Sequence, residues 1–387
     1  MTPSPIRVLV VDDSAFMRKM VSEILARDAG ICVAGQARDG ADALVKMETL
    51  KPDVITMDIE MPVLDGIGAL QEIMQRCPTP VVMVSSLTHA GAESTMRCLE
   101  LGAVDFIGKP SGSISLDIEK VAVEIIAKVK AAAGARLSRR RSSQVARPNP
   151  TSIAPSLPAP PTIVPAKPAI CQLPRRSREK IGVLAIGSST GGPRALQQLI
   201  PMLPADLGVP IVIVQHMPPG FTASLAHRLQ QMSSFIVREA VDGDRLRPGE
   251  ILVAPGGHHL QFDAGGLARL TDEPPIHGVR PAVDVTLASL ARLYGGRMLA
   301  VLLTGMGKDG ARAMKQISDM GGMTLAEDES TCVVYGMPKA AYDLGGVSCL
   351  LPLPAIAPAI VRACGSYSQM IDTNDRETHK KLTRGTS

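Results

Sequence analysis

Acidic, hydroxyl and basic residues end the apolar runs of the first third of the chain, in positions suited to phosphate chemistry. The residues are Asp12, Asp13, Asp58, Ser85 and Lys109. Three carboxylates in one crevice repel each other unless a cation holds them, and such oxygen ligands suit Mg²⁺. The lysine and the hydroxyl could then bind phosphoryl oxygens. Each aspartate alone could be a helix cap, but five such residues at four run ends favour a phosphate-accepting site.

A second reactive set lies in the glycine-rich string GSSTGG at 187–192, directly after an apolar run. It fits the pattern G-x-S-x-G, which places Ser189 at a sharp turn between a strand and a helix. The amides of Thr190 and Gly191 would then be unpaired at a helix N-terminus, where they can hold a phosphate or the oxyanion of acyl transfer. A dinucleotide or phosphate loop is the alternative, but the GxGxxG spacing, the Walker lysine and a ribose-binding acid are missing.

A serine nucleophile needs a base, and His216 ends the next apolar run, PIVIVQH. The chain turns immediately afterwards at MPPG, so His216 is not expected to be a simple core residue. Other histidines lie in a strand-rich segment or a loop, without a comparable place at a strand end: His258, His259 and His277. His216 is therefore the preferred base.

A base needs an orienting carboxylate, and Asp309 follows the run RMLAVLLTG. This residue could also be only the N-cap of the next helix, or could cap and orient at once. Asp284 in RPAVDV is the alternative acid. The chain order of Ser189, His216 and Asp309 differs from the serine–aspartate–histidine order of α/β-hydrolases, so the same chemistry would stand on another topology.

The elements that must position the first set are predicted within residues 5–130. Five β-branched runs alternate there with helix-period segments: 6–11, 31–37, 53–58, 80–85 and 104–109. In the segment 15–26, Phe16, Met20, Val21 and Ile24 fall on one helical face. The alternation predicts an α/β fold with a doubly wound, five-stranded parallel sheet, in which ligands bind beyond the carboxyl ends of the strands.

The second set lies in a block at 180–364 that opens in the same way. Buried strands are predicted at 181–187, 210–216 and 297–305. An all-β patch is expected between them, from four short runs near 235–240, 250–255, 259–262 and 267–270.

Positive charge is concentrated between the two blocks. Residues 134–180 hold ten basic residues and one acid, so this segment carries +9 and the rest of the chain −5. The same segment holds nine of the 31 prolines, which disfavour helix and sheet interiors. We therefore predict a linker at 131–179 and a polar tail at 366–387. The run of three arginines at 139–141 could be an interaction patch, but a solvated linker is favoured.

Composition restricts the partners. The chain has no Trp, four Tyr and five Phe, too few rings for stacking single-stranded nucleic acid. Its N-terminus lacks the pattern of a signal peptide, and no run reaches 18 apolar residues. The seven cysteines are odd in number and form no CxxC pair, which suggests free, buried thiols in a reducing compartment. These features predict a cytoplasmic protein with no nucleic-acid partner and no membrane insertion.

The first block resembles the receiver domain of bacterial response regulators over residues 5–125. The resemblance is carried by VLVVDDS, MDIEMPVLDG, Ser85 and the Lys109–Pro110 pair. It implies that a chemotaxis histidine kinase phosphorylates Asp58, and that Mg²⁺ bound by Asp12, Asp13 and Asp58 assists. It further implies a conformational switch at Ser85, Phe106 and Lys109.

The second block resembles the catalytic domain of the chemotaxis-receptor methylesterases, through GSSTGGP, VQHMP, RPAVDV, LTGMGKDGA and YGMPKAA. The resemblance implies a modified doubly wound parallel sheet with Ser189 as nucleophile, His216 as general base and Asp309 as its orienter. Thr190, Gly191 and Met306 would contact the oxyanion or the substrate.

The implied substrates are glutamate methyl esters on methyl-accepting chemotaxis receptors, hydrolysed to release methanol without a cofactor. Many members of this family also deamidate receptor glutamines. The chain departs from the family pattern at Ser188, where alanine is usual, and at Glu327, where glutamine is familiar.

Together the blocks predict an esterase controlled by phosphorylation, with the unphosphorylated receiver covering the active site. A DNA-binding response regulator is one alternative, and it would require a helix-turn-helix after the receiver. A non-catalytic interaction module is another, and a covalent serine-directed probe would separate it from an enzyme.

Overall fold

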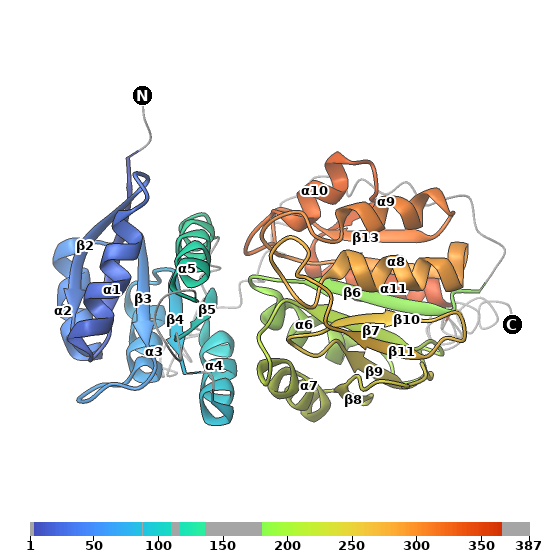
Figure 1. The fold of residues 1–387 in the computed structure, drawn as a ribbon, viewed down its shortest axis with the longest axis horizontal. Coiled ribbons are helices and arrows are strands. Elements are labelled where there is room, and N and C mark those ends of the chain that lie inside the picture. The colour runs from blue at the N-terminus through green and yellow to red at the C-terminus, as the bar shows by residue number, and fades with distance from the viewer. Residues whose placement is uncertain (1–3, 87, 110–116, 136–179, 366–387) are drawn as a thin grey trace, which may run out of the picture.

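Two parallel β-sheets, each covered by helices on both faces, make up the computed structural model, which describes residues 4–86, 88–109, 117–135 and 180–365 (Figure 1). The predicted α/β fold with two doubly wound sheets is confirmed. The predicted linker at 131–179 begins too early, because residues 131–133 end the helix Asp117–Ala133; its residues 136–179, like the predicted tail at 366–387, lie outside the described residues.

The N-terminal sheet has five strands in the order β2-β1-β3-β4-β5. They are β1 Ile6–Val11, β2 Ile31–Ala37, β3 Val54–Asp58, β4 Val81–Ser85 and β5 Asp105–Gly108. Its helices are α1 Ala15–Ala26, α2 Gly40–Leu50, α3 Gly66–Arg76, α4 His89–Leu101 and α5 Asp117–Ala133. Helices α1 and α5 pack on one face of the sheet, and α2, α3 and α4 cover the other. The strands follow the predicted runs closely.

Local sequence sets where the helices of this domain begin. Ser14, Asp39, Asp65 and Thr88 each accept a hydrogen bond from the amide three residues later. Such caps satisfy amides that the first helical turn leaves unpaired. Phe16, expected on the buried face of α1, is 63% exposed. It lies in the first turn, beyond the strand ends, where the helix has little sheet surface to cover.

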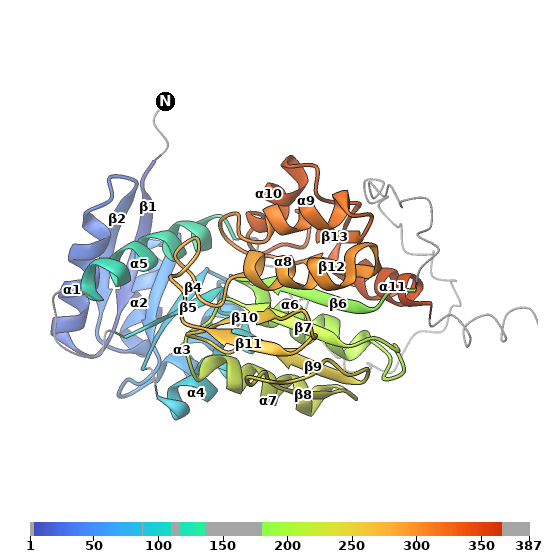
Figure 2. The same cartoon turned by 45° about the vertical axis from the view of Figure 1, so that its right-hand side comes forward.

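The C-terminal sheet has seven strands in the order β14-β13-β12-β6-β7-β9-β8. They are β6 Val183–Ser188, β7 Ile211–Gln215, β8 Ile236–Glu239, β9 Glu250–Val253, β12 Met298–Leu302, β13 Met323–Glu327 and β14 Cys349–Leu351. Its helices are α6 Gly192–Leu199, α7 Phe221–Met232, α8 Val283–Tyr294, α9 Ala311–Asp319, α10 Met337–Asp343 and α11 Leu353–Cys364. Helices α6, α7 and α11 cover one face and α8 and α9 the other (Figure 2). Because β6 is central, its carboxyl end lies in the middle of the crevice edge.

The expected all-β patch at 235–270 is only partly correct. Strands β8 and β9 pair in parallel with each other, and β9 pairs with β7, so both extend the main sheet. Only β10 His259–Phe262 and β11 Ala268–Thr271 form a separate antiparallel hairpin. Short apolar runs show that a segment is a strand, but not which strand it will pair with.

The cysteine expectation also needs correction. Cys98, Cys332 and Cys364 are buried free thiols, but Cys32 and Cys77 are exposed, and Cys349 is disulfide-bonded. Spacing along the chain does not reveal which sulfur atoms meet after folding. Within the described ranges, none of the helices has the length and apolar character needed to cross a membrane.

Candidate active site and phosphorylation site

Three carboxylates meet at the carboxyl edge of the N-terminal sheet. Asp12 and Asp13 follow β1, Asp58 ends β3, and one oxygen of each lies within 4.8 Å of the others. Asp12 and Asp58 are 2% and 1% exposed. Burial raises the pKa of Asp12 to about 6, and the nearby charge of Asp58 adds to the effect. Buried, mutually repelling oxygens are a donor set that fits a hard divalent cation, so the pocket has the character of a Mg²⁺ site.

The cation already present in this pocket is Lys109, whose Nζ lies 2.7 Å from Asp58 Oδ2 and 3.9 Å from Asp12 Oδ2. Burial raises the pKa of Asp58, although the hydrogen bond from Lys109 works against this shift. Ser85 also lies at this edge, but its hydroxyl donates to the Gly91 carbonyl at 3.2 Å and accepts from Thr95 at 2.8 Å. Ser85 thus contacts α4 in this state.

In the C-terminal domain, Ser189 lies on the turn that joins β6 to α6. Gly191 has φ +78°, a left-handed conformation that favours glycine, and it serves as the N-cap of α6. Within the described residues, the amides of Thr190 and Gly191 donate no hydrogen bond. The turn therefore presents unpaired amide donors beside a serine.

Burial distinguishes the two adjacent serines. Ser188 is fully buried, and its hydroxyl donates to Gln215 Oε1 at 2.7 Å. Ser189 is half-buried and its hydroxyl makes no hydrogen bond to a described residue. Only the second hydroxyl is therefore free for chemistry.

Gln215 was not singled out by the sequence, although it connects the two strands that carry the candidate nucleophile and base. Ser188 and Gln215 pair between β6 and β7, so Ser189 and His216 are the next neighbours along the edge. The Gln215 amide donates to the carbonyl oxygens of Ser189 at 3.0 Å and of His216 at 3.2 Å. The signal that could have identified Gln215 is a glutamine at the end of an apolar run, directly before the candidate base His216.

His216 and Asp309 are hydrogen-bonded at this edge, with Nε2 2.8 Å from Oδ2. Because Asp309 holds Nε2, Nδ1 is the ring nitrogen left to face a substrate or a hydroxyl. Among the described residues, His216 has no hydrogen bond to Ser189. Such contacts often tighten only when substrate binds.

Asp309 caps a helix, but not the one that follows it. Its carboxylate accepts from the amides of Val283 at 2.6 Å and Asp284 at 2.9 Å, the first residues of α8, while Gly310 caps α9. Burial alone would raise the pKa of Asp309, but the hydrogen bonds from His216 and these amides outweigh it and hold the pKa below its ordinary value. The carboxylate is thus ionised and fixed from two sides.

The competing residues have other partners. His259 is fully buried between the Pro274 carbonyl and the Ala282 amide, and His258 pairs with Asp272. His277 Nε2 lies 3.3 Å from Asp284 Oδ2, so the alternative acid contacts a different histidine. None of these contacts involves His216.

The loop after β12 completes the surroundings of Ser189. A Cβ at Gly305 would lie 2.9 Å from Ser189 Cβ, so only glycine fits this close approach. Met306 is the next residue and is 38% exposed. Thr304, which precedes Gly305, accepts the Ser189 amide hydrogen bond at 3.0 Å. The sequence did not identify Thr304 or Gly305 as part of this site.

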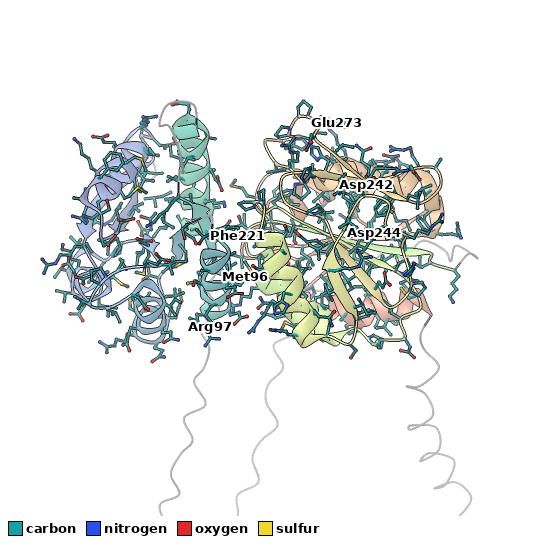
Figure 3. The ribbon with its side chains drawn as sticks, turned by 60° about the horizontal axis from the view of Figure 1, so that its bottom comes forward. Met96, Arg97, Phe221, Asp242, Asp244 and Glu273 are labelled. Carbon is teal, nitrogen blue, oxygen red and sulfur yellow. The ribbon has the colours of Figure 1, made fainter. Side chains whose placement is uncertain are left out.

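The two domains meet beside this turn. Phe106 of β5 stacks on Phe221 of α7, with ring centroids 4.5 Å apart and planes inclined by 13°. Its neighbour Asp105 accepts a hydrogen bond of 2.5 Å from Thr190 Oγ1. Figure 3 shows Phe221 and Met96 where the domains face each other. The receiver-like domain therefore contacts the residue directly after Ser189.

Helix α4 adds a polar contact to the same interface. Its Glu100 pairs with Arg228 of α7 and also with Arg97 of its own helix. Apolar side chains from both domains belong to one continuous buried cluster. Figures 1 and 2 both show α4 and β5 turned toward the C-terminal domain.

Comparisons with known proteins match both halves. A family model described as CheB methylesterase matches residues 184–360, and one described as response regulator receiver domain matches residues 8–118. A protein-glutamate methylesterase/protein-glutamine glutaminase of Symbiobacterium thermophilum is 55% identical over 365 residues, covering 93% of this chain and 98% of the relative.

Two further relatives bear the same name. The one from Archaeoglobus fulgidus is 45% identical over 359 residues, with 92% of this chain and 97% of the relative covered. The one from Pseudomonas aeruginosa, numbered 2 in its name, is 47% identical over 361 residues, with the same coverage of 92% and 97%.

Proposed function

Because the chain belongs to the CheB methylesterase family and is a protein-glutamate methylesterase/protein-glutamine glutaminase with a response regulator receiver domain, we propose that Ser189, His216 and Asp309 form its hydrolytic triad. The observation that supports this most is the 2.8 Å bond between His216 and Asp309, one strand from a half-buried serine on a glycine-rich turn. The test is methanol release from methylated receptor, with and without a phosphodonor.

In the proposed reaction, His216 Nδ1 accepts the Ser189 proton while Oγ attacks the γ-carbonyl carbon of the substrate. The amides of Thr190 and Gly191, at the N-terminus of α6, stabilise the oxyanion, and Met306 contacts the substrate. The tetrahedral intermediate collapses, the C–O bond to the methyl group's oxygen breaks, and the leaving methanol takes the proton from His216.

Water then attacks the acyl-enzyme, with His216 again accepting a proton, and the glutamate leaves as Ser189 regains its hydrogen. With a glutamine substrate the leaving group is ammonia. Asp309 holds the ring orientation and stabilises the imidazolium formed in each step.

We further propose that the substrates are methyl-accepting chemotaxis receptors and that a chemotaxis histidine kinase in the cytoplasm phosphorylates Asp58. Asp12, Asp13 and Asp58 would hold Mg²⁺, which offsets the charge of the entering phosphoryl group. Lys109 would pair with one phosphoryl oxygen. The Ser85 hydroxyl would give up its hydrogen bond to the Gly91 carbonyl and donate to a second phosphoryl oxygen.

Asp58→Asn is expected to remove the whole increase in methanol release that a small-molecule phosphodonor produces, because the phosphoryl acceptor is lost. Chelation of Mg²⁺ with EDTA should remove the same increase from the wild-type protein. Basal release should stay within about twofold of wild type, since Asp58 is remote from Ser189 in the chain's other domain. Stimulation that survives in this variant would contradict the assignment of Asp58.

Regulation would act through the contact between domains. The receiver contacts the residue after Ser189 through Asp105 and contacts α7 through Phe106, and phosphorylation would loosen this packing. A substrate helix would then gain access to the turn.

Arg228→Ala should raise basal methanol release without a phosphodonor, because it removes the ion pair with Glu100 across the interface. A partly exposed pair contributes up to about 1 kcal/mol, so the increase should be about two- to fivefold. Arg76→Ala removes an ion pair within α3 and serves as the control. An unchanged basal rate in Arg228→Ala, with normal stimulation, would contradict this interface as the regulatory one.

A further inference from the structure

The buried carboxyl group of Glu327 has no part in the proposed triad, although it lies close to it. Glu327 is the last residue of β13 and is 0% exposed. Its Oε2 accepts a hydrogen bond of 2.9 Å from the Thr304 amide. Within the described part of the chain, Oε1 has no hydrogen-bond partner. Burying a carboxyl group with so few partners is costly, so its presence calls for a physical explanation.

Thr304 links this carboxyl group to the candidate catalytic turn. The Thr304 carbonyl accepts from the Ser189 amide at 3.0 Å. Its hydroxyl donates to the Thr190 carbonyl at 2.9 Å and accepts from the Val334 amide at 2.9 Å. One residue thus holds both Ser189 and Thr190, and its own amide is held by Glu327.

We propose that Glu327 is a positioning residue that acts through Thr304 to fix the backbone of Ser189 and Thr190. The proposal rests on Ser189 being the nucleophile. Glu327 contacts no reacting atom, but a shift of Thr304 would move both the nucleophile and an oxyanion amide. Misplacement of reacting groups by about 1 Å can cost about 100-fold in rate, so a distant holding contact can have a large effect.

The protonation state of Glu327 follows from its surroundings. Burial raises its pKa, although the Thr304 amide and the side chains of Thr331 and Cys332 work in the opposite direction. The other charged groups nearby are Asp328, which raises the pKa further, and Arg194 of α6, which lines the same cavity of about 260 Å³. Burial therefore makes the Glu327 carboxyl group harder to ionise than an exposed glutamate.

This shift has a definite sign. The folded protein keeps the Glu327 proton to higher pH than the unfolded chain does. The contribution of the group to stability therefore falls as pH rises from the ordinary carboxyl range to the raised pKa. As pH rises through the raised pKa, ionisation places a buried negative charge beside Thr304, which should loosen the turn.

The experiment uses the full-length protein and measures the rate at which a fluorophosphonate probe labels Ser189, located by mass spectrometry. Glu327→Ala should label about tenfold more slowly than wild type while still melting cooperatively, because the Thr304 amide loses its acceptor. Glu327→Gln keeps an oxygen of the same shape that can accept from the Thr304 amide. At the lowest pH of the measured profile, this variant should label within about twofold of wild type.

The pH profile separates positioning from simple folding support. The ratio of the wild-type rate to the Glu327→Gln rate should fall as pH rises, because only the wild-type side chain ionises. Glu329→Gln, which changes an exposed carboxylate two residues away, should keep the wild-type profile.

Equal labelling of wild type and Glu327→Ala would overturn the proposal, as would a Glu327→Gln variant that folds but labels as slowly as the alanine variant. If Glu327→Ala does not fold, the test is the ratio of the wild-type labelling rate to the Glu327→Gln labelling rate. A ratio that stays constant with pH would then overturn the proposal. Failure of the nucleophile assignment is recognised separately, since mass spectrometry would then find no label on Ser189 of the wild-type protein.

Discussion

Ser189→Ala is expected to lower kcat for methanol release from methylated receptor by about 10⁶-fold, because removing the nucleophile of a triad leaves only binding and oxyanion stabilisation. The substitution removes a half-buried hydroxyl oxygen that makes no hydrogen bond to a described residue, so the fold should be unaffected. Thermal melting should therefore match that of the wild type. The measurement is methanol release at saturating substrate, with and without phosphodonor.

Ser188→Ala is the matched control, one residue away in the same turn. It removes the buried hydrogen bond to Gln215, which contributes about 1 kcal/mol. We expect methanol release to fall by tenfold at most, through slight loosening of the strand ends, together with a small drop in melting temperature. Loss of all activity in Ser188→Ala, with activity kept in Ser189→Ala, would reverse the assignment of the two serines.

Asp309→Asn is expected to lower kcat by about 10⁴-fold, because an amide nitrogen facing His216 favours the wrong ring tautomer and cannot stabilise the imidazolium. KM should change little, since Asp309 is 2% exposed and has no free surface for substrate.

The same substitution should carry a pH signature. Because the pKa of Asp309 is held below its ordinary value, its contribution to stability is fully present above the ordinary carboxyl range and is lost as pH falls through the lowered pKa. Wild type should thus be more stable than Asp309→Asn at neutral pH, and the difference should shrink in acid. Thermal melting at several pH values measures it.

Asp284→Asn tests the alternative acid. Asp284 contacts His277 and the Ala313 amide, and its pKa is raised by burial rather than lowered. We expect a loss of activity below tenfold. A loss of about 10³-fold or more here, with Asp309→Asn close to wild type, would show that Asp284 orients the base.

The fold was largely predictable because its main signals are local. β-Branched runs separated by amphipathic segments predict a parallel sheet, and most strands begin and end within one or two residues of those runs. The exceptions had weaker signals: β13 and β14 were not identified, and β8 and β9 were expected in a separate patch. Pairing depends on contacts between distant segments, which short runs do not encode.

The candidate site was predictable to the extent that strand ends determine position. In a parallel sheet, residues at the carboxyl ends must gather at one edge, so Asp12 and Asp58, and likewise Ser189 and His216, are neighbours by topology. Their roles stay predictions until the substitutions above are made.

By itself the sequence determined two α/β domains, the residue types at each crevice and the family they indicate. Only the tertiary structure decided which of the two adjacent serine hydroxyls is free and which carboxylate contacts His216. It also decided that Glu327 is buried against Thr304. Finally, it decided that Asp105 contacts the residue after Ser189, and that Phe106 contacts α7. The reason is physical. Strand and helix signals arise within a few residues, whereas hydrogen-bond partners and burial depend on distances between segments far apart in the chain, as between Thr304 and Thr190, which are separated by 114 residues.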